Sequence, residues 1–260
     1  LNADTISKDS IDTYLLGKTL SPVESSVFMV NKEHIFVGKD VTIKPGVVLD
    51  ATNGPIFIDN NACILPNVTI MGPVYIGFKT VIKCGAKIYG GTTIGPVCKI
   101  GGEVENCIIQ GYSNKAHDGF LGSSYLGSWV NLGAGTENSN LKNNYKTIKV
   151  NINGKNMNTG TLFVGVAIGD HTKTSIKTMF NSGTIIGFCC NLFDTNFHKK
   201  EVPSFAWGSP AEYEEYDIEK AIATAKAVMQ RREVNFSAAH DRTFRKIFEL
   251  TKEERKAAKL

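Results

Sequence analysis

The sequence predicts an all-β solenoid, a left-handed parallel β-helix of hexapeptide repeats with helices at its C-terminal end. First, a branched aliphatic residue recurs at every sixth position from residue 37 to residue 100, with one three-residue insertion at 53–55. Second, the last three positions of each repeat collect Gly, Pro, Asn, Asp and Lys. Third, the composition becomes helical in type after residue 193. A fixed internal period of this kind is the signature of a solenoid.

The six-residue repeat has a direct physical explanation. Each repeat supplies a short strand whose inward side chains lie two residues apart, and the following Gly, Pro or Asn turns the chain. Three repeats close one coil, and successive coils stack at about 4.8 Å with their backbones hydrogen-bonded. The aliphatic column should therefore form the core, and its members are Val37, Ile43, Leu49, Ile58, Ile64, Ile70, Ile76, Ile82, Ile88, Ile94 and Ile100.

The repeat is interrupted twice further along. Its register slips near Val104 and recovers with Leu126 and Leu132 facing inward. The Asn-rich and Lys-containing segment 136–160 cannot pack in an aliphatic core without many polar partners. We therefore expect it to leave the coil as a loop or hairpin, turning at Asn153, and to reach toward the active cleft. After this segment the predicted inward residues are Leu162, Ile168, Thr174, Phe180, Ile186 and Leu192.

The two ends are predicted to differ from the solenoid of residues 35–208. Residues 1–34 carry one expected helix at 11–18, interpreted as the remnant of a linker from an upstream domain. Residues 209–260 form an expected helical extension, which begins at Ser209 with a capping Ser followed by Pro. These helices should cover the solenoid end or a neighbouring subunit, because stacked coils end in unpaired backbone. The apolar stripe of the first helix is Ile218, Ala221, Ile222, Ala225, Val228 and Met229.

Composition excludes several classes of protein. The 29 basic and 25 acidic residues give a net charge of +4 without a block of like charges, so no nucleic-acid partner is expected. No apolar run is long enough to span a membrane, and no membrane partner is expected. The six cysteines include no C-x-x-C pair, which indicates packing thiols in a reducing, cytoplasmic protein.

Candidate chemistry lies where the repeat breaks, at residues 112–120. His117 beside Asp118 could be a general base or a hydrogen-bonded turn histidine, and the pattern alone leaves both open. His171 beside Asp170 has the same ambiguity, with the turn residue favoured. The five histidines lack the spacing that a β-helix zinc hydratase uses, so no metal site is predicted.

The run KAHDGFLGSSYLGSWVNLGAGTENSNLKNN at 115–144 resembles the acetyltransferase half of the bifunctional sugar-1-phosphate nucleotidyltransferase/acetyltransferases. The stretches TIKVNINGK and VGVAIGDHTKTSI resemble archaeal members of that group. The resemblance implies an acetyl-CoA-dependent N-acetyltransferase that acts on an amino-sugar 1-phosphate in nucleotide-sugar synthesis. It also implies a homotrimer, with acetyl-CoA and the sugar phosphate as partners.

The resemblance assigns roles to matching positions. His117 matches the catalytic base, Asn131 a contact to the sugar, and Ala134 the residue whose backbone amide faces the acetyl carbonyl. Asn140 matches an Asn of the loop that closes on the substrate. Phe120 stands where the group has a substrate-contacting Tyr, so that hydroxyl is missing.

The sequence also departs from the family pattern. The motif around His117 is one residue shorter, and Tyr89 and Asn106 replace the Arg and Lys that grip the sugar phosphate. Lys142 and Lys146 of the inserted segment are the expected substitutes, and Asp118 is the candidate to orient His117. The nucleotidyltransferase half is absent from this sequence. The competing hypothesis is a non-catalytic, trimerising and regulatory β-helix.

Overall fold

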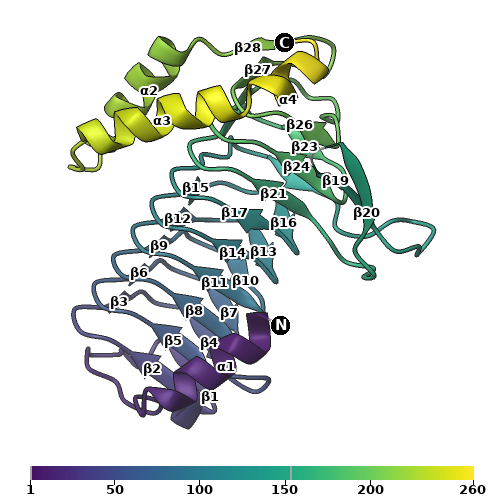
Figure 1. Cartoon of the computed structure of the whole chain (residues 1–260). Helices are drawn as coiled ribbons and strands as arrows, with labels where there is room; N and C mark the ends of the chain where they lie inside the picture. The colour runs from purple at the N-terminus through teal and green to yellow at the C-terminus, as the bar shows by residue number, and fades with distance from the viewer. Residues whose placement is uncertain (1, 153) are drawn as a thin grey trace.

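The computed structural model describes residues 2–152 and 154–260, so Asn153 of the predicted hairpin turn lies outside the described residues. Its short strands stack in three parallel sheets, which form the three faces of a prism (Figure 1). This arrangement confirms the predicted parallel β-helix. Every face takes one strand from nearly every coil, which explains why the hexapeptide period appears three times per coil.

The bounds of the strands follow the faces. Face 1 contains β2 (Ile35–Val37), β5 (Ile56–Ile58), β8 (Val74–Ile76), β11 (Thr92–Ile94), β14 (Ile108–Ile109), β17 (Tyr125–Leu126), β21 (Val166–Ile168), β24 (Thr184–Ile186) and β26 (Glu201–Val202). Face 2 contains β3 (Thr42–Ile43), β6 (Cys63–Ile64), β9 (Val81–Ile82), β12 (Lys99–Ile100), β15 (Asn114–Lys115), a bridge at Asn131, β22 (Lys173–Thr174), β25 (Asn191–Leu192), β27 (Ala206–Gly208) and β28 (Tyr213–Glu215). Face 3 contains β1 (Phe28–Val30), β4 (Val48–Asp50), β7 (Thr69–Met71), β10 (Lys87–Ile88), β13 (Glu103–Glu105), β16 (Phe120–Gly122), and then β18 (Glu137–Asn138) paired with β23 (Met179–Phe180).

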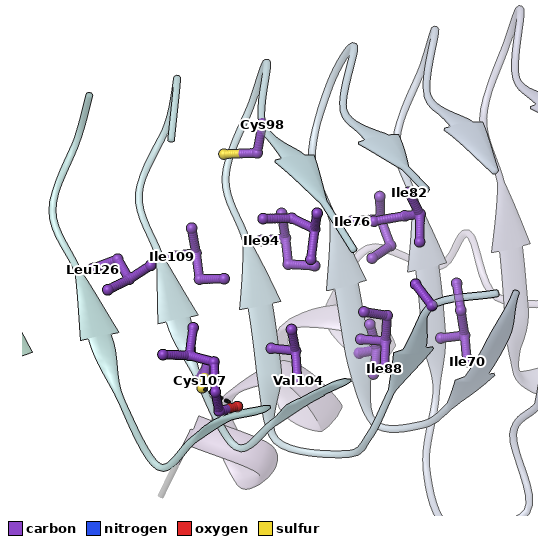
Figure 2. Packing of buried hydrophobic residues seen from close by; sticks show 14 of the residues in the cluster. Ile70, Ile76, Ile82, Ile88, Ile94, Cys98, Val104, Cys107, Ile109 and Leu126 are labelled. Carbon is purple, nitrogen blue, oxygen red and sulfur yellow. Dashed lines mark hydrogen bonds between the residues drawn. The ribbon is translucent and has the colours of Figure 1, made fainter. Parts of the chain in front are cut away.

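The core is the predicted aliphatic column. No member of the column from Val37 to Ile100 is more than 7% exposed, and Figure 2 shows part of it enclosed between the strands. Val104, Ile109, Leu121, Leu126 and Leu132 continue it through the slipped register. Ile168, Thr174, Phe180, Ile186 and Leu192 are buried as predicted. Leu162 is 39% exposed, so its predicted inward position is wrong.

The inserted segment leaves the coil later than its polar composition indicated. Thr136 and Asn138 are buried, and β18 pairs in parallel with β23. The chain departs after Asn138 and re-enters at β21. In between, β19 (Lys149–Ile152) and β20 (Lys155–Asn158) form an antiparallel hairpin, and β19 packs against β24. Leu162 is exposed because it still belongs to this excursion.

Both ends correct the sequence analysis. The first helix, α1, spans Asn2–Asp12 and lies across β8 and β11, so the helix predicted at 11–18 is wrong. Tyr14 and Gly17 take positive φ angles of 55° and 79°, which end the helix. A short 3₁₀ turn (Lys32–His34) follows, and β1 already belongs to the coils.

At the C-terminal end, Ser209 starts no helix. Its backbone N–H donates to the carbonyl of Glu212 (2.9 Å) in the turn between β27 and β28, which pair antiparallel. Helix α2 (Ile218–Gln230) begins later with Asp217 as its cap, and α3 (Ala238–Leu250) and α4 (Lys252–Ala257) follow. Within the predicted stripe of α2, Ala221, Ile222, Ala225 and Met229 are buried. No helix in the two described stretches is long and apolar enough to cross a membrane.

Candidate active site

His117 and Ala134 occupy the same turn position in successive coils. Asn114 and Asn131 are register partners, and His117 and Ala134 each lie three residues after one of them. The backbone N–H of Gly135 donates to the carbonyl of Asp118 (3.0 Å), which stacks the two turns directly. Stacked coils lie about 4.8 Å apart. The candidate base and the candidate amide donor are therefore neighbours.

The N–H of Ala134 is free to bind a ligand. It donates no hydrogen bond within the described stretches, and Pro45 and Pro66 stand at the same turn position of earlier coils. Proline lacks an N–H, so the fold does not need a donor at this position. This amide could donate to the oxygen of a bound carbonyl group.

The His117 side chain is exposed, and its ring forms no hydrogen bond to Asp118 in the described part of the chain. The Asp118 backbone carbonyl accepts from Gly135, while its carboxylate is exposed. The structure therefore places these adjacent residues on one turn without joining their side chains.

Lys115 is a residue of this turn that the sequence analysis missed. It is only 2% exposed and stands in the aliphatic column, where neighbouring coils carry Ile100 and Leu132. Its Nζ donates to the carbonyls of Gly101 (2.8 Å) and His117 (2.9 Å), so the ammonium holds the His117 turn against the coil before it. The signal was available, because a Lys at a column position breaks the aliphatic rule.

Burial lowers the pKa of Lys115 from its ordinary 10.5 to about 8, since the charged form loses water. The negative charges of Asp118, Glu137 and Glu103 oppose this effect. A buried ammonium this close to a candidate base is typical of a functional turn rather than of a structural one.

Asn131 lies on face 2 with its side chain exposed. Its Oδ1 accepts from Nδ2 of Asn114 (3.3 Å), and Oδ1 of Asn114 accepts from Nη2 of Arg232 (2.7 Å). Arg232 follows α2, so the helical extension reaches back onto the face that carries Asn131. No signal near position 131 could have predicted this contact, because the two partners are 118 residues apart.

Phe120 and Asn140 lie on face 3, toward the opposite edge from His117. Both adjoin Gly122, and Nδ2 of Asn140 donates to Oγ of Ser123 (3.2 Å). The same oxygen accepts from Nδ2 of Asn106 (3.5 Å), so this edge is lined by neutral polar groups.

The two loop lysines do not join the His117 turn within this chain. Nζ of Lys142 donates to the carbonyl of Thr147 (3.1 Å), and Lys146 is exposed. The hairpin that follows them stands out beside β24 (Figure 1).

The second candidate base, His171, is a structural residue. It is 5% exposed, and its ring lies 4.9 Å from that of Phe244 on α3. Burial lowers its pKa to about 3, so the imidazole is neutral at physiological pH. Oδ1 of Asp170 accepts from the backbone of Ser128 (3.0 Å) instead of contacting this ring. His171 therefore anchors α3 to the coils.

Metal and disulfide chemistry find no support in residues 2–152 and 154–260. No three His, Cys, Asp or Glu side chains gather there as a metal would need. All six cysteines are free thiols, and Cys98, Cys107, Cys189 and Cys190 are buried.

Comparison with known proteins gives partial matches. No protein-family model matches the chain. It is 29% identical over 174 residues to a bifunctional sugar-1-phosphate nucleotidylyltransferase/acetyltransferase of Sulfurisphaera tokodaii, a match that covers 58% of this chain and 43% of the relative. It is 30% identical over 169 residues to the bifunctional protein GlmU of Wigglesworthia glossinidia brevipalpis, covering 58% of this chain and 33% of that protein. The chain thus spans less than half the length of these relatives.

A solved structure, a UDP-N-acetylglucosamine acyltransferase of Arabidopsis, aligns with 84% of this chain and 78% of its own at 15% identity and a TM-score of 0.42. That likeness is too loose to add to the fold described above. The sequence matches carry the relationship: this chain is a hexapeptide-repeat β-helix related to the bifunctional sugar-1-phosphate nucleotidylyltransferase/acetyltransferases of the GlmU type.

Proposed function

We propose that the chain is an acetyl-CoA-dependent N-acetyltransferase that acts on an amino-sugar 1-phosphate in cytoplasmic nucleotide-sugar synthesis. The observation that carries the proposal is the shared turn position of His117 and Ala134 in stacked coils. An exposed imidazole and an unused amide N–H lie side by side, which is the arrangement that acyl transfer to an amine requires.

The chemistry divides between these groups. Acetyl-CoA supplies the acyl group as a thioester. His117 takes a proton from the sugar amine as its nitrogen attacks the thioester carbonyl, and the Ala134 N–H donates to the oxygen that gains negative charge. The carbon–sulfur bond then breaks, and the CoA sulfur leaves with the proton that His117 carries. Aligning two bound substrates supplies about 7–11 kcal/mol of the barrier, so a rigid solenoid suits the reaction.

Release of CoA thiol tests the proposal. The chain is incubated with acetyl-CoA and either glucosamine 1-phosphate or galactosamine 1-phosphate, and thiol is followed with a chromogenic reagent. We expect turnover with one of the two sugars and none without sugar. A folded chain that releases no thiol with either sugar would contradict the proposed activity.

We further propose a homotrimer, because one chain does not assemble the whole candidate site. His117 and Ala134 lie at one edge of face 3, whereas Asn140, Lys142 and Lys146 belong to the other edge. A neighbouring copy would bring these edges together. Ile176, which has the same turn position as Ala134 one coil later, is 65% exposed, and Phe193 and Phe197 near it are also exposed. These apolar side chains suit an interface at the His117 edge.

Light scattering on the purified chain at micromolar concentration should give the mass of three copies. Ile176→Lys should shift the population toward the monomer, because it places a charge in the expected contact. Ile11→Lys, on the exposed side of α1, is the matched control and should remain assembled. A monomeric wild type would rule out the trimer.

One observation favours a second candidate, a non-catalytic trimerising and regulatory β-helix. The His117 ring has no orienting partner in the described part of the chain, and Phe120 presents no hydroxyl. A thermal shift with acetyl-CoA separates the two functions. Stabilisation by acetyl-CoA supports the transferase, whereas its absence supports the regulatory role.

A further inference from the structure

Four basic residues gather on face 2 next to the His117 turn. Lys83 directly follows β9, Lys99 belongs to β12, and Arg231 and Arg232 follow the end of α2. Arg232 is fixed in place, since Nη2 donates to Oδ1 of Asn114 (2.7 Å) and Nη1 to the carbonyl of Val97 (3.4 Å). Asn114 is the register partner of Lys99 on the next strand. We call Lys83, Lys99, Arg231 and Arg232 the face-2 basic cluster.

The cluster lies close to the proposed base. The N–H of Lys83 donates to the carbonyl of Ile100, and the N–H of Gly101 to that of Lys115, so Lys83, Gly101 and Ala116 stack in three successive coils. Ala116 directly precedes His117. Two coil spacings amount to about 10 Å, which is within the length of a small phosphorylated substrate.

The positive charge of the cluster is not neutralised by the protein. None of the four residues forms an ion pair with a carboxylate in the described stretches. Repulsion from Arg232, followed by burial and by the charges of Lys83 and Arg231, lowers the pKa of Lys99. Holding like charges together costs free energy, and an anion between them would remove that cost.

The two arginines are delivered by a rigid element. The buried stripe of α2 packs with Phe205 and Phe244 in one apolar cluster. Arg245 of α3 forms a bidentate pair with Glu219 of α2 (2.6 and 3.1 Å), which ties the helices together. The end of α2 therefore cannot move away from face 2 without breaking this packing. A surface with scattered charges would need no such support.

We propose that the face-2 basic cluster binds the phosphate of a substrate of the transferase. This inference rests on the proposed function, and it names the site that would hold the anionic part of that substrate. Guanidinium groups bind phosphate oxygens through paired N–H donors, and lysines add point charge. The phosphate could belong to the acyl-CoA donor or to the sugar acceptor, since both offer the same chemistry.

The test compares two double variants of the full chain. Lys99→Gln/Arg231→Gln removes two charges of the cluster whose side chains make no hydrogen bond, and it leaves the structural Arg232 intact. Lys39→Gln/Lys44→Gln removes two exposed charges in an earlier coil, and Lys44 has the same turn position as Lys83. Circular dichroism should show both variants folded, because none of the four side chains is buried.

Calorimetric titration with CoA, glucosamine 1-phosphate and inorganic pyrophosphate measures binding, and initial rates give KM for each substrate. We expect the cluster variant to weaken pyrophosphate binding by about tenfold or more, which is the usual loss for a charge-assisted contact. The control variant should bind as the wild type does. A raised KM for acetyl-CoA alone assigns the site to the donor, and a raised KM for the sugar alone assigns it to the acceptor.

The outcomes separate this inference from the proposed function. If the wild type is active and the cluster variant matches the control in pyrophosphate binding and in both KM values, the cluster binds no phosphate and the transferase stands. If the wild type is inactive but binds pyrophosphate, and only the cluster variant loses that binding, the phosphate site stands and the proposed reaction fails.

Discussion

Replacing His117 by Ala should lower the rate of acetyl transfer by about 10²–10⁴-fold, the usual contribution of a positioned general base. The expected loss lies in kcat rather than in the affinity for acetyl-CoA, because the Ala134 amide and the rest of the coil remain in place. Initial rates at saturating sugar, together with titration of CoA, distinguish these two effects.

A matched control is available for this variant. His34→Ala removes another exposed histidine, from the 3₁₀ turn before the first face-1 strand, and should retain the wild-type rate. Equal rates for wild type and His117→Ala would leave the proposed mechanism without its base. A comparable loss in both histidine variants would indicate a general effect on folding instead.

The stability of the wild type should rise with pH because of Lys115. Its pKa is about 8 in the folded chain and 10.5 when unperturbed, so between these values the unfolded chain holds a proton that the folded chain has released. Stability increases with pH wherever the unfolded state binds more protons. At about 1.36 kcal/mol per pKa unit, the whole interval contributes roughly 3 kcal/mol.

Lys115→Met removes this contribution while restoring an apolar side chain to the column. Urea unfolding at pH 7 and at pH 10.5 should therefore show that the wild type gains stability relative to the variant by roughly 3 kcal/mol. Lys87→Met is the control, because Lys87 is an exposed lysine whose Nζ lies 4.0 Å from Glu103. Parallel pH profiles for wild type and Lys115→Met would show that Lys115 is not perturbed by burial.

The fold could be predicted because its rule is local. Each hexapeptide specifies one strand and one turn, so Ile58 or Ile88 is assigned to the core without knowledge of any distant residue. The Ser209 helix failed for the opposite reason. Its Ser-Pro-Ala-Glu pattern favours a helix, but β27 of the last coil needed a hydrogen-bonding partner, and pairing with β28 prevailed.

The candidate site could be predicted only in part. His117 and Ala134 follow from a motif and from the turn spacing, and the stacking of coils then brings them together. Arg232 could not be found, because its contact with Asn114 depends on how α2 docks. Lys115 was open to discovery as a charge in an aliphatic column, which shows that violations of the repeat deserve the same scrutiny as its matches.

The antiparallel pairing of β28 with β27 has a consequence for solubility. Every other junction between coils is parallel, so the last coil alone would present a ready template for the first coil of another molecule. Because β28 runs in the reverse direction, a second chain cannot continue the stack in register at that end. The protein thereby avoids growing head to tail into filaments, a hazard inherent in any β-solenoid.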